Sequence, residues 1–132
     1  MKIYFAGAIR GGRQKVNDYQ KMVKQFQKNG HIVLTEHVAD PNLTIEGDNV
    51  TDRDIYLRDT KWLEECDLVF ADVTVPSLGV GYEIAYAEKL NKKIYVVYEK
   101  EKNISGLIKG DINLEKFSYS NIDEVLDKIN KI

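Results

Sequence analysis

The sequence predicts an α/β fold: a single-domain, Rossmann-like, doubly wound parallel sheet of about five strands with helices on both faces. Candidate strands and helices alternate along the whole 132-residue chain. The strands are nearly continuous apolar runs, as in Leu68–Ala71, which is typical of strands that are covered on both faces. Glycine-containing loops follow two of these strands, and ligands bind at the carboxyl ends of the strands in such sheets.

The first half of the chain begins with a predicted strand, Lys2–Ala6. A helix follows, because apolar residues recur at helical spacing and the chain then reaches Asn29-Gly30, a favoured helix end. The recurring residues are Val16, Tyr19, Val23 and Phe26. His31–Thr35 is predicted to be the second strand. The polar segment Glu36–Thr51 is predicted to be a loop, long enough to form a functional lid or the rim of a site.

The second half continues the alternation. A helix is predicted from Thr51 to Cys66, and a strand over Asp67–Val73. The next helix follows the Ser/Gly turn and ends near Asn91, and Lys93–Tyr98 is the fourth predicted strand.

The remaining residues are predicted to form three short elements. These are a helical segment over Ser105–Lys109, a weak strand over Leu114–Phe117, and a last helix capped by Asn121. The last helix carries its apolar residues on one face, namely Ile122, Val125, Leu126 and Ile129.

Composition excludes several classes of function. The net charge of −2 gives no broad basic field, so we expect neither a nucleic-acid polymer nor a membrane as partner. A single cysteine suits a reducing compartment. No apolar run is long enough to span a bilayer, and the first residues do not resemble a signal peptide, so a cytoplasmic location is expected. Two histidines and one cysteine show no metal-ligand spacing, and we expect no metal and no cofactor.

Two loops could hold a phosphate. Pro76–Glu83 joins a strand to a helix through Ser77 and glycines, and free backbone N–H groups at such a turn bind anions. It has neither Walker nor GxGxxG spacing, and such turns also simply connect elements. Gly7–Arg13 offers Arg10 and Arg13 among three glycines, either as phosphate ligands or as solvated side chains of an ordinary turn.

Two carboxylates stand where apolar residues are expected. Asp59 falls on the apolar stripe of its helix, opposite a charged face that includes Arg58. Glu83 falls at the inner edge of the following helix, where the helix dipole is expected to favour its ionised form. Capping roles would explain each acid separately, so the structural interpretation stays open. Together they predict a two-acid site beside a phosphate cradle.

Three blocks of the sequence together resemble one family. They are the runs Tyr4–Arg13, Leu34–Val38 and Pro76–Glu83, and Asp59 with Trp62-Leu63 adds to them. These blocks are similar to those of the 2'-deoxynucleoside 5'-phosphate N-hydrolases, within the nucleoside 2-deoxyribosyltransferase superfamily. The resemblance extends over roughly Ile3–Gly110, and the tail beyond it is not matched.

The resemblance implies a role for each matching residue. Glu83 would be the nucleophile that forms a deoxyribosyl-enzyme ester, Tyr4 would orient it, and Asp59 would assist departure of the base and activate water. His37 would lie near the nucleobase, and Ser105 would reach the phosphate in the partner subunit's site, which implies a homodimer. The implied pocket for sugar and phosphate consists of Gly7, Ala8, Ile9, Arg10, Gly11, Gly12, Arg13, Ser77 and Gly79.

One position departs from the compared pattern, because Leu107 replaces a methionine. The two side chains have similar volumes, so we expect the change to affect base preference more than binding.

Three hypotheses for function remain. The first is hydrolysis of a 2'-deoxynucleoside 5'-monophosphate to free base and deoxyribose 5-phosphate. The second is base exchange on unphosphorylated deoxynucleosides, with hydrolysis of a ribonucleotide or modified pyrimidine nucleotide as a related option. The third is a nucleotide sensor that binds without cleaving, against which the presence of Tyr4, Asp59 and Glu83 counts.

Overall fold

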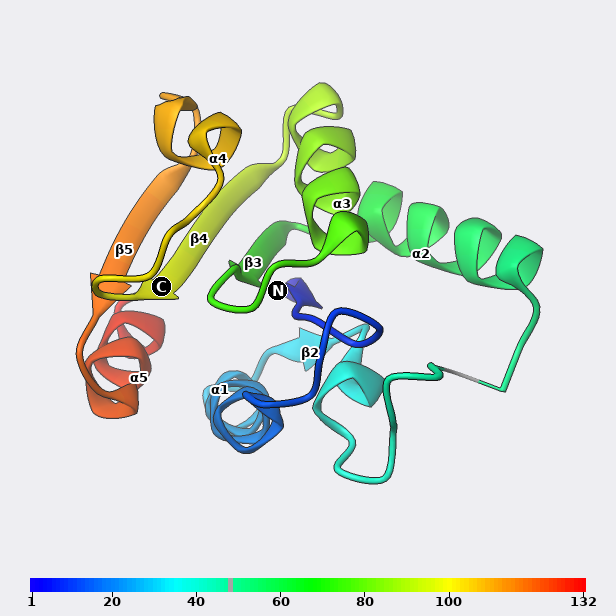
Figure 1. Cartoon of the computed structure of the whole chain (residues 1–132), viewed down its shortest axis with the longest axis horizontal. Helices are drawn as coiled ribbons and strands as arrows, with labels where there is room; N and C mark the ends of the chain where they lie inside the picture. Colours follow the sequence, from blue (N-terminus) through cyan, green and yellow to red (C-terminus); the bar gives the residue numbers. More distant parts are fainter. Residues whose placement is uncertain (48) are drawn as a thin grey trace.

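The computed structural model describes residues 1–47 and 49–132, and these form a five-stranded sheet with helices on both faces (Figure 1). All neighbouring strands are parallel, in the order β2-β1-β3-β4-β5, which confirms the predicted fold class. The strands are β1 (Lys2–Ala6), β2 (Ile32–Val33), β3 (Leu68–Asp72), β4 (Lys93–Glu99) and β5 (Glu115–Tyr119). The helices are α1 (Val16–Lys28), the 3-10 helix η1 (Glu36–Ala39), α2 (Asp52–Glu65), α3 (Leu78–Lys89), α4 (Gly106–Gly110) and α5 (Ile122–Asn130).

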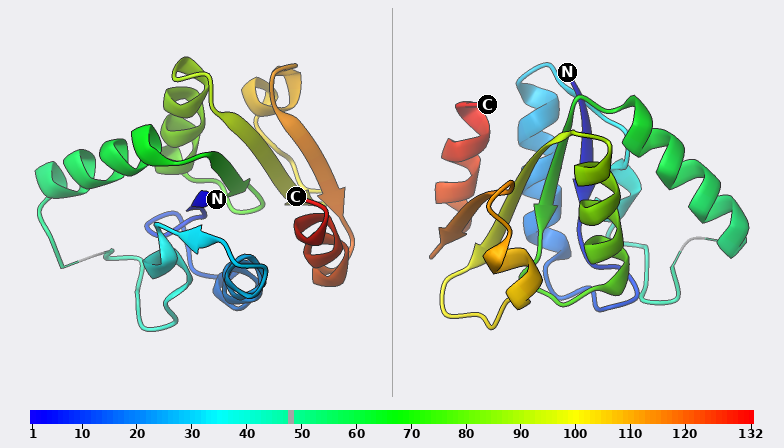
Figure 2. Two further views of the ribbon diagram at one scale, coloured as in Figure 1. Left: turned by 180° about the vertical axis from the view of Figure 1, so that it is seen from behind. Right: turned by 90° about the horizontal axis from the view of Figure 1, so that it is seen from above.

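The two faces of the sheet bury separate sets of side chains, because successive residues of a strand point to opposite faces. Ile3 and Phe5 of β1 belong to the core that α1 and α5 cover. Tyr4 and Ala6 face the other way, into the core under α2 and α3. Figure 2 shows these two helical layers on either side of the sheet. The alternation along β1 therefore places Tyr4 on the same side as α2 and α3.

The order of the strands places a crevice at β1 and β3. From β1 the chain moves outward to β2, and it then returns to pair β3 with the other edge of β1. In open parallel sheets, ligands bind outside the carboxyl ends of the strands at such a switch point. The segments that leave β1 and β3 lead into the two loops that the sequence offered as phosphate cradles, Gly7–Arg13 and Pro76–Glu83.

Two predicted elements differ from the structure between β1 and α2. The second strand was expected over His31–Thr35, but β2 contains only Ile32–Val33. Thr35 Oγ1 accepts a hydrogen bond from the Phe5 N–H (2.8 Å) and donates to the Phe5 carbonyl (2.6 Å). The side chain thus replaces the backbone ladder, and η1 begins where a loop was expected. The remainder of that expected loop includes residue 48, which lies outside the described residues.

Side-chain caps set the starts of three helices. Thr51 Oγ1 caps α2 by accepting from Asp54 N (3.1 Å), and Ser77 Oγ caps α3 by accepting from Val80 N (3.3 Å). The predicted cap Asn121 is confirmed for α5. Helix α2 extends past the edge of the sheet in Figures 1 and 2, and Leu63, near its C-terminal end, is its one fully buried residue.

Candidate active site

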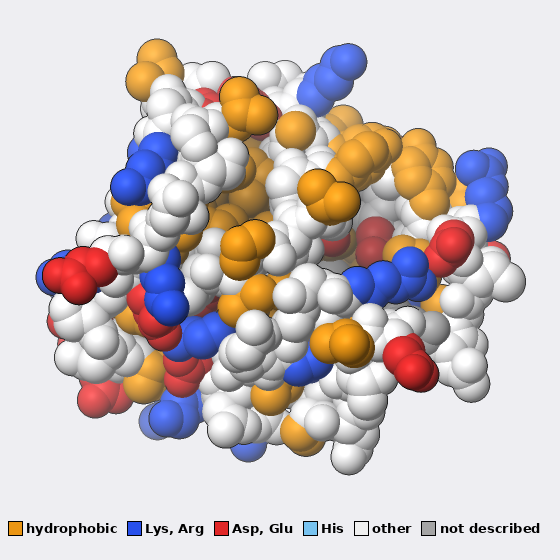
Figure 3. Space-filling model, viewed as in Figure 1, with side chains coloured by type: hydrophobic (Ala, Val, Ile, Leu, Met, Phe, Trp, Pro, Cys, Tyr) orange, Lys and Arg blue, Asp and Glu red, His pale blue; other side chains and the backbone are white. Residues whose placement is uncertain are grey.

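A cavity of about 680 Å³ opens at the switch point, between α2, α3 and the loop after β1. Figure 3 shows the hollow, with acidic side chains at its floor and hydrophobic side chains and a basic one around its rim. Eight of the residues predicted for the site line it: Gly7, Ile9, Arg10, Gly11, Asp59, Ser77, Gly79 and Glu83. The structure therefore brings both predicted loops and both predicted acids to one cavity.

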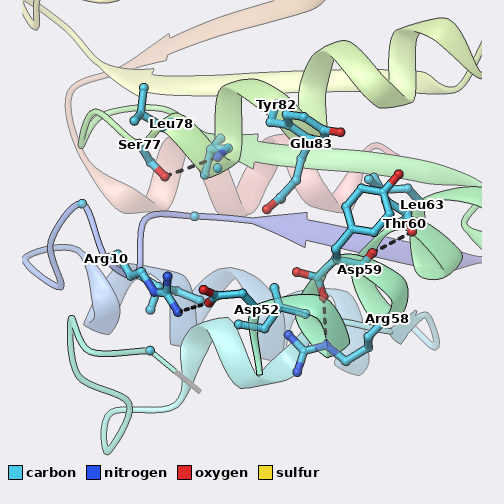
Figure 4. A pocket seen from close by; sticks show the side chains of 18 of the residues that line it. Arg10, Asp52, Arg58, Asp59, Thr60, Leu63, Ser77, Leu78, Tyr82 and Glu83 are labelled. Atoms are coloured by element: carbon cyan, nitrogen blue, oxygen red, sulfur yellow. Dashed lines mark hydrogen bonds and ion pairs between the residues drawn. The ribbon is translucent and has the colours of Figure 1, made fainter. Parts of the chain in front are cut away.

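Glu83 and Asp59 extend into the cavity from different helices and point toward each other (Figure 4). Burial, followed by the negative charge of Asp59, raises the pKa of Glu83 from 4.5 to about 8. The hydrogen bond from Tyr4 and the positive charge of Arg58 act in the opposite direction. The expected effect of the helix dipole is outweighed, because Glu83 lies in the second turn of α3, beyond the reach of the helix terminus.

Tyr4 stands behind Glu83 rather than in the cavity wall. It is 2% exposed on β1, and its hydroxyl hydrogen-bonds to the Glu83 carboxylate. Burial and the neighbouring charge of Glu83 raise the pKa of Tyr4 well above its usual value. Tyr4 therefore remains a hydrogen-bond donor at neutral pH, and its bond favours the ionised form of Glu83.

The loop after β1 and the turn before α3 meet through their backbones. A Cβ atom at Gly11 would lie 2.4 Å from the Pro76 carbonyl oxygen, much closer than such atoms can approach. A Cβ atom at Gly7 would lie 2.9 Å from the ring of Tyr19. Glycine at both positions lets the chain pass close under the cavity, as expected for a loop that presents its backbone to a ligand.

The two arginines of this loop have different surroundings. Arg10 lines the cavity mouth, and its Nη2 lies 3.1 Å from Oδ1 of Asp52 in the first turn of α2. Both side chains are largely exposed, so this ion pair is weak and a phosphate could displace it. Arg13 does not line the cavity. Its guanidinium donates to four backbone carbonyls, those of Ala8, Val38, Asp40 and Leu43.

The bonds of Arg13 indicate a structural role. They join the loop after β1 to the segment that follows β2 and stabilise the floor beneath the cavity. Ala8 and Gly12 likewise lie outside the cavity lining, and the Ala8 N–H is bound by the Tyr19 hydroxyl (3.2 Å). Ala8, Gly12 and Arg13 thus belong to the loop after β1 but do not line the cavity, whereas other residues of the same loop do.

The family profile of nucleoside 2-deoxyribosyltransferase matches residues 3–122. The chain belongs to this family. It is similar to the 5-hydroxymethyl-dUMP N-hydrolase of Danio rerio (47% identity, covering 83% of this chain and 78% of that protein). It is also similar to the protein of the same name from Esox lucius (41% identity, covering 94% and 88%). The resemblance drawn from the sequence blocks is confirmed.

Solved structures share the fold at low sequence identity. The CMP N-glycosidase BcmB of Clostridium botulinum superimposes with a TM-score of 0.74 at 22% identity, over 98% of this chain and 99% of that one. BlsM superimposes with a TM-score of 0.80 at 18% identity, over 98% and 86%. The α/β architecture is therefore shared by proteins of widely different sequence.

Three further residues that the resemblance assigned to the site, on η1 and at the start of α4, also lie outside the cavity lining. His37, on η1, reaches the site indirectly, because its Nε2 accepts from Arg58 Nη2 (3.3 Å). Ser105 and Leu107 are exposed at the start of α4, and Leu107 is 87% exposed. Within one copy of the chain, neither α4 residue contributes to the cavity wall.

Sequence reasoning missed the charged side chains at the wall of the site. Arg58 was assigned to the solvent face of its helix, yet it lines the cavity beside Asp59. The sequence signal for Arg58 was its spacing to Trp62, because residues four apart on a helix are neighbours.

Among the described residues there is no cluster of acidic, histidine or cysteine side chains that could hold a metal ion. A search of the same residues finds no helix long and apolar enough to cross a membrane.

Proposed function

We propose that this protein hydrolyses the N-glycosidic bond of 2'-deoxynucleoside 5'-monophosphates, releasing the free base and 2-deoxyribose 5-phosphate. The observation that carries the proposal is the pair Glu83 and Asp59 facing each other in a cavity that ends at glycine loops. The relatives named 5-hydroxymethyl-dUMP N-hydrolase support a nucleoside monophosphate as the substrate.

The reaction would proceed in two steps. The Glu83 carboxylate attacks C1', the C1'–N bond breaks with its electron pair leaving on the base, and Asp59 supplies the proton that the base needs. Water then attacks C1' of the glycosyl ester, Asp59 takes its proton, and Glu83 is released as a carboxylate. Such a route passes through an oxocarbenium-like transition state, which a carboxylate under C1' stabilises.

The electrostatics of the cavity fit a nucleophile that is activated when the substrate binds. A pKa of about 8 leaves most of Glu83 protonated at pH 7. When two carboxyl groups lie in different environments, one of them can donate a proton while the other stays ionised. Tyr4 holds the ionised form in place through its hydrogen bond. The phosphate would lie at the loop 7–13 and the start of α3, where Arg10 and the first N–H groups of the helix are available to it.

A homodimer would complete the site. The apolar side chains Leu78 (97% exposed), Tyr82 (57%) and Leu107 (87%) lie uncovered around α3 and α4. A second copy covering this face would bury them and could bring its Ser105 to the phosphate end of the cavity. Size-exclusion chromatography with light scattering tests this arrangement. A chain that remains monomeric at assay concentrations while fully active would refute the shared site.

Product analysis tests the activity. Wild type and Glu83→Gln are incubated with the four deoxynucleoside monophosphates, 5-hydroxymethyl-dUMP and CMP, and the released base is measured by chromatography. We expect base release from at least one deoxynucleotide by wild type and none by the variant. Base release by Glu83→Gln at a rate near that of wild type would refute the assignment.

Base exchange is the second candidate, because the family includes transferases of deoxyribose. Deoxyadenosine and its 5'-monophosphate are incubated separately with an acceptor base. Faster conversion of the unphosphorylated nucleoside, with the new nucleoside as product, would favour the transferase.

A further inference from the structure

Arg58 forms a largely enclosed ion pair at the wall of the cavity. Its Nε donates to Oδ1 of Asp59 at 2.9 Å, and the two side chains are 28% and 19% exposed. The pair at the cavity mouth, Arg10 with Asp52, is 59% and 86% exposed by comparison. Figure 4 shows Arg58 approaching the Asp59 carboxylate from the side away from Glu83.

The guanidinium of Arg58 is itself held by two aromatic rings. It lies 5.0 Å from the centre of the Trp62 ring, one helical turn along α2. Its Nη2 donates to Nε2 of His37 at 3.3 Å, and the His37 and Trp62 rings lie 5.8 Å apart. A planar guanidinium suits both contacts, since its face stacks on an aromatic ring while its edge donates hydrogen bonds.

These contacts determine the direction of Asp59. With one carboxylate oxygen fixed by Arg58, the side chain extends into the cavity toward Glu83. Among the described residues, the charged and titratable groups that act on Glu83 besides Asp59 are Tyr4 from β1 and Arg58 from α2, and His37 from η1 contacts Arg58. Without the guanidinium, the Asp59 carboxylate would lose the hydrogen bond and the opposite charge that fix one of its oxygens.

We propose that Arg58 is a positioning residue, which holds the Asp59 carboxylate in the orientation that handles the protons of the base and of water. Trp62 and His37 hold Arg58 in place. The inference rests on the proposed function, since it concerns the acid of that reaction. It assigns Arg58 a role that acts through Asp59 and not through contact with the substrate.

A double-mutant cycle tests the inference. Single-turnover rates and KM are measured for wild type, Arg58→Gln, Asp59→Asn and the double variant, with the deoxynucleotide that wild type hydrolyses fastest. We expect Arg58→Gln to lower the single-turnover rate by on the order of 10- to 100-fold, because misplacing a reacting group by about 1 Å has an effect of this size. KM should change much less, and Arg58→Gln should have little further effect when Asp59 is already Asn.

The control is Lys61→Gln, which removes one positive charge from an exposed position of the same helix and should keep the wild-type rate. Arg58→Lys keeps the charge but loses the planar fork, and it should recover only part of the rate. If Arg58→Gln does not fold, as judged by circular dichroism, the cycle is run with Arg58→Lys.

Two results would overturn the inference. Equal losses from the Arg58 substitution in both backgrounds would show that Arg58 acts independently of Asp59. A single-turnover rate of Arg58→Gln unchanged from wild type, or an effect confined to KM, would show that Arg58 does not position Asp59. Failure of the proposed function has a different signature, because wild type would then release no base or Glu83→Gln would remain active.

Discussion

Replacing Tyr4 by phenylalanine should shift the pH dependence of the reaction. The Tyr4 hydroxyl stabilises the ionised form of Glu83 by a hydrogen bond, and so lowers a pKa that burial raises to about 8. A hydrogen bond to a charged group contributes about 1.5–3 kcal/mol, and one pH unit corresponds to about 1.4 kcal/mol. Loss of the bond should therefore raise the pKa of Glu83 by about one to two pH units.

The assay is the pH profile of kcat/KM, which reports the ionisation of the free enzyme. In the proposed reaction only the ionised Glu83 carboxylate attacks C1', so the acidic limb of the profile should move to higher pH in Tyr4→Phe by about one to two pH units. At pH 7 the variant should be about 10- to 100-fold slower, and it should recover most of the loss above the new midpoint.

Tyr119→Phe is the matched control. Tyr119 is also a buried tyrosine that donates to a carboxylate, Asp72, at 2.8 Å, and neither residue lines the cavity. Its loss should lower stability without moving the acidic limb. A Tyr4→Phe profile reduced by the same factor at every pH would refute the reasoning, because the bond would then not act through the ionisation of Glu83.

Three further predictions concern stability and the loops. Glu83→Gln should raise Tm relative to wild type at pH 8 and above but not at pH 4. The raised pKa of Glu83 makes wild type lose stability as the pH rises from 4.5 to about 8, and the variant has no such group. An equal difference in Tm at both pH values would contradict this. Gly11→Ala should lower the free energy of unfolding by about 1–3 kcal/mol, because its methyl group meets the Pro76 carbonyl, whereas Gly81→Ala, which meets nothing within 4 Å, should not. Arg13→Gln should lower the free energy of unfolding in urea by about 2–4 kcal/mol, because it leaves several partly buried carbonyls unpaired. A large rise in KM with unchanged stability would indicate phosphate binding instead.

The fold was predictable because its pattern is local. Apolar runs such as that of β3 and helical spacing such as that of α1 follow from neighbouring residues. The end of β2 was not predictable, because it depends on hydrogen bonds between Thr35 and Phe5, which lies thirty residues earlier. Such a contact leaves no mark on the periodicity of the strand itself.

The candidate site was predictable to the extent that its residues looked misplaced. Asp59 and Glu83 stood out as acids on apolar stripes, and both line the cavity. Arg13 and Arg58 did not follow their apparent roles, because a guanidinium is satisfied by whichever acceptors the fold brings near it. Carbonyls from three segments surround Arg13, and an acid, an imidazole and an indole surround Arg58.

The close approach of Gly11 to Pro76 joins the loop after β1 to the turn before α3 at the base of the cavity. Helix α2, in contrast, is anchored at its Leu63 end and reaches outward with little beneath it. Substitutions in the first turns of α2, before Arg58 and Asp59, can therefore change one wall of the cavity while the glycine loops at its base stay in place. The shape of the cavity can in this way differ between relatives while both acids and both loops are kept.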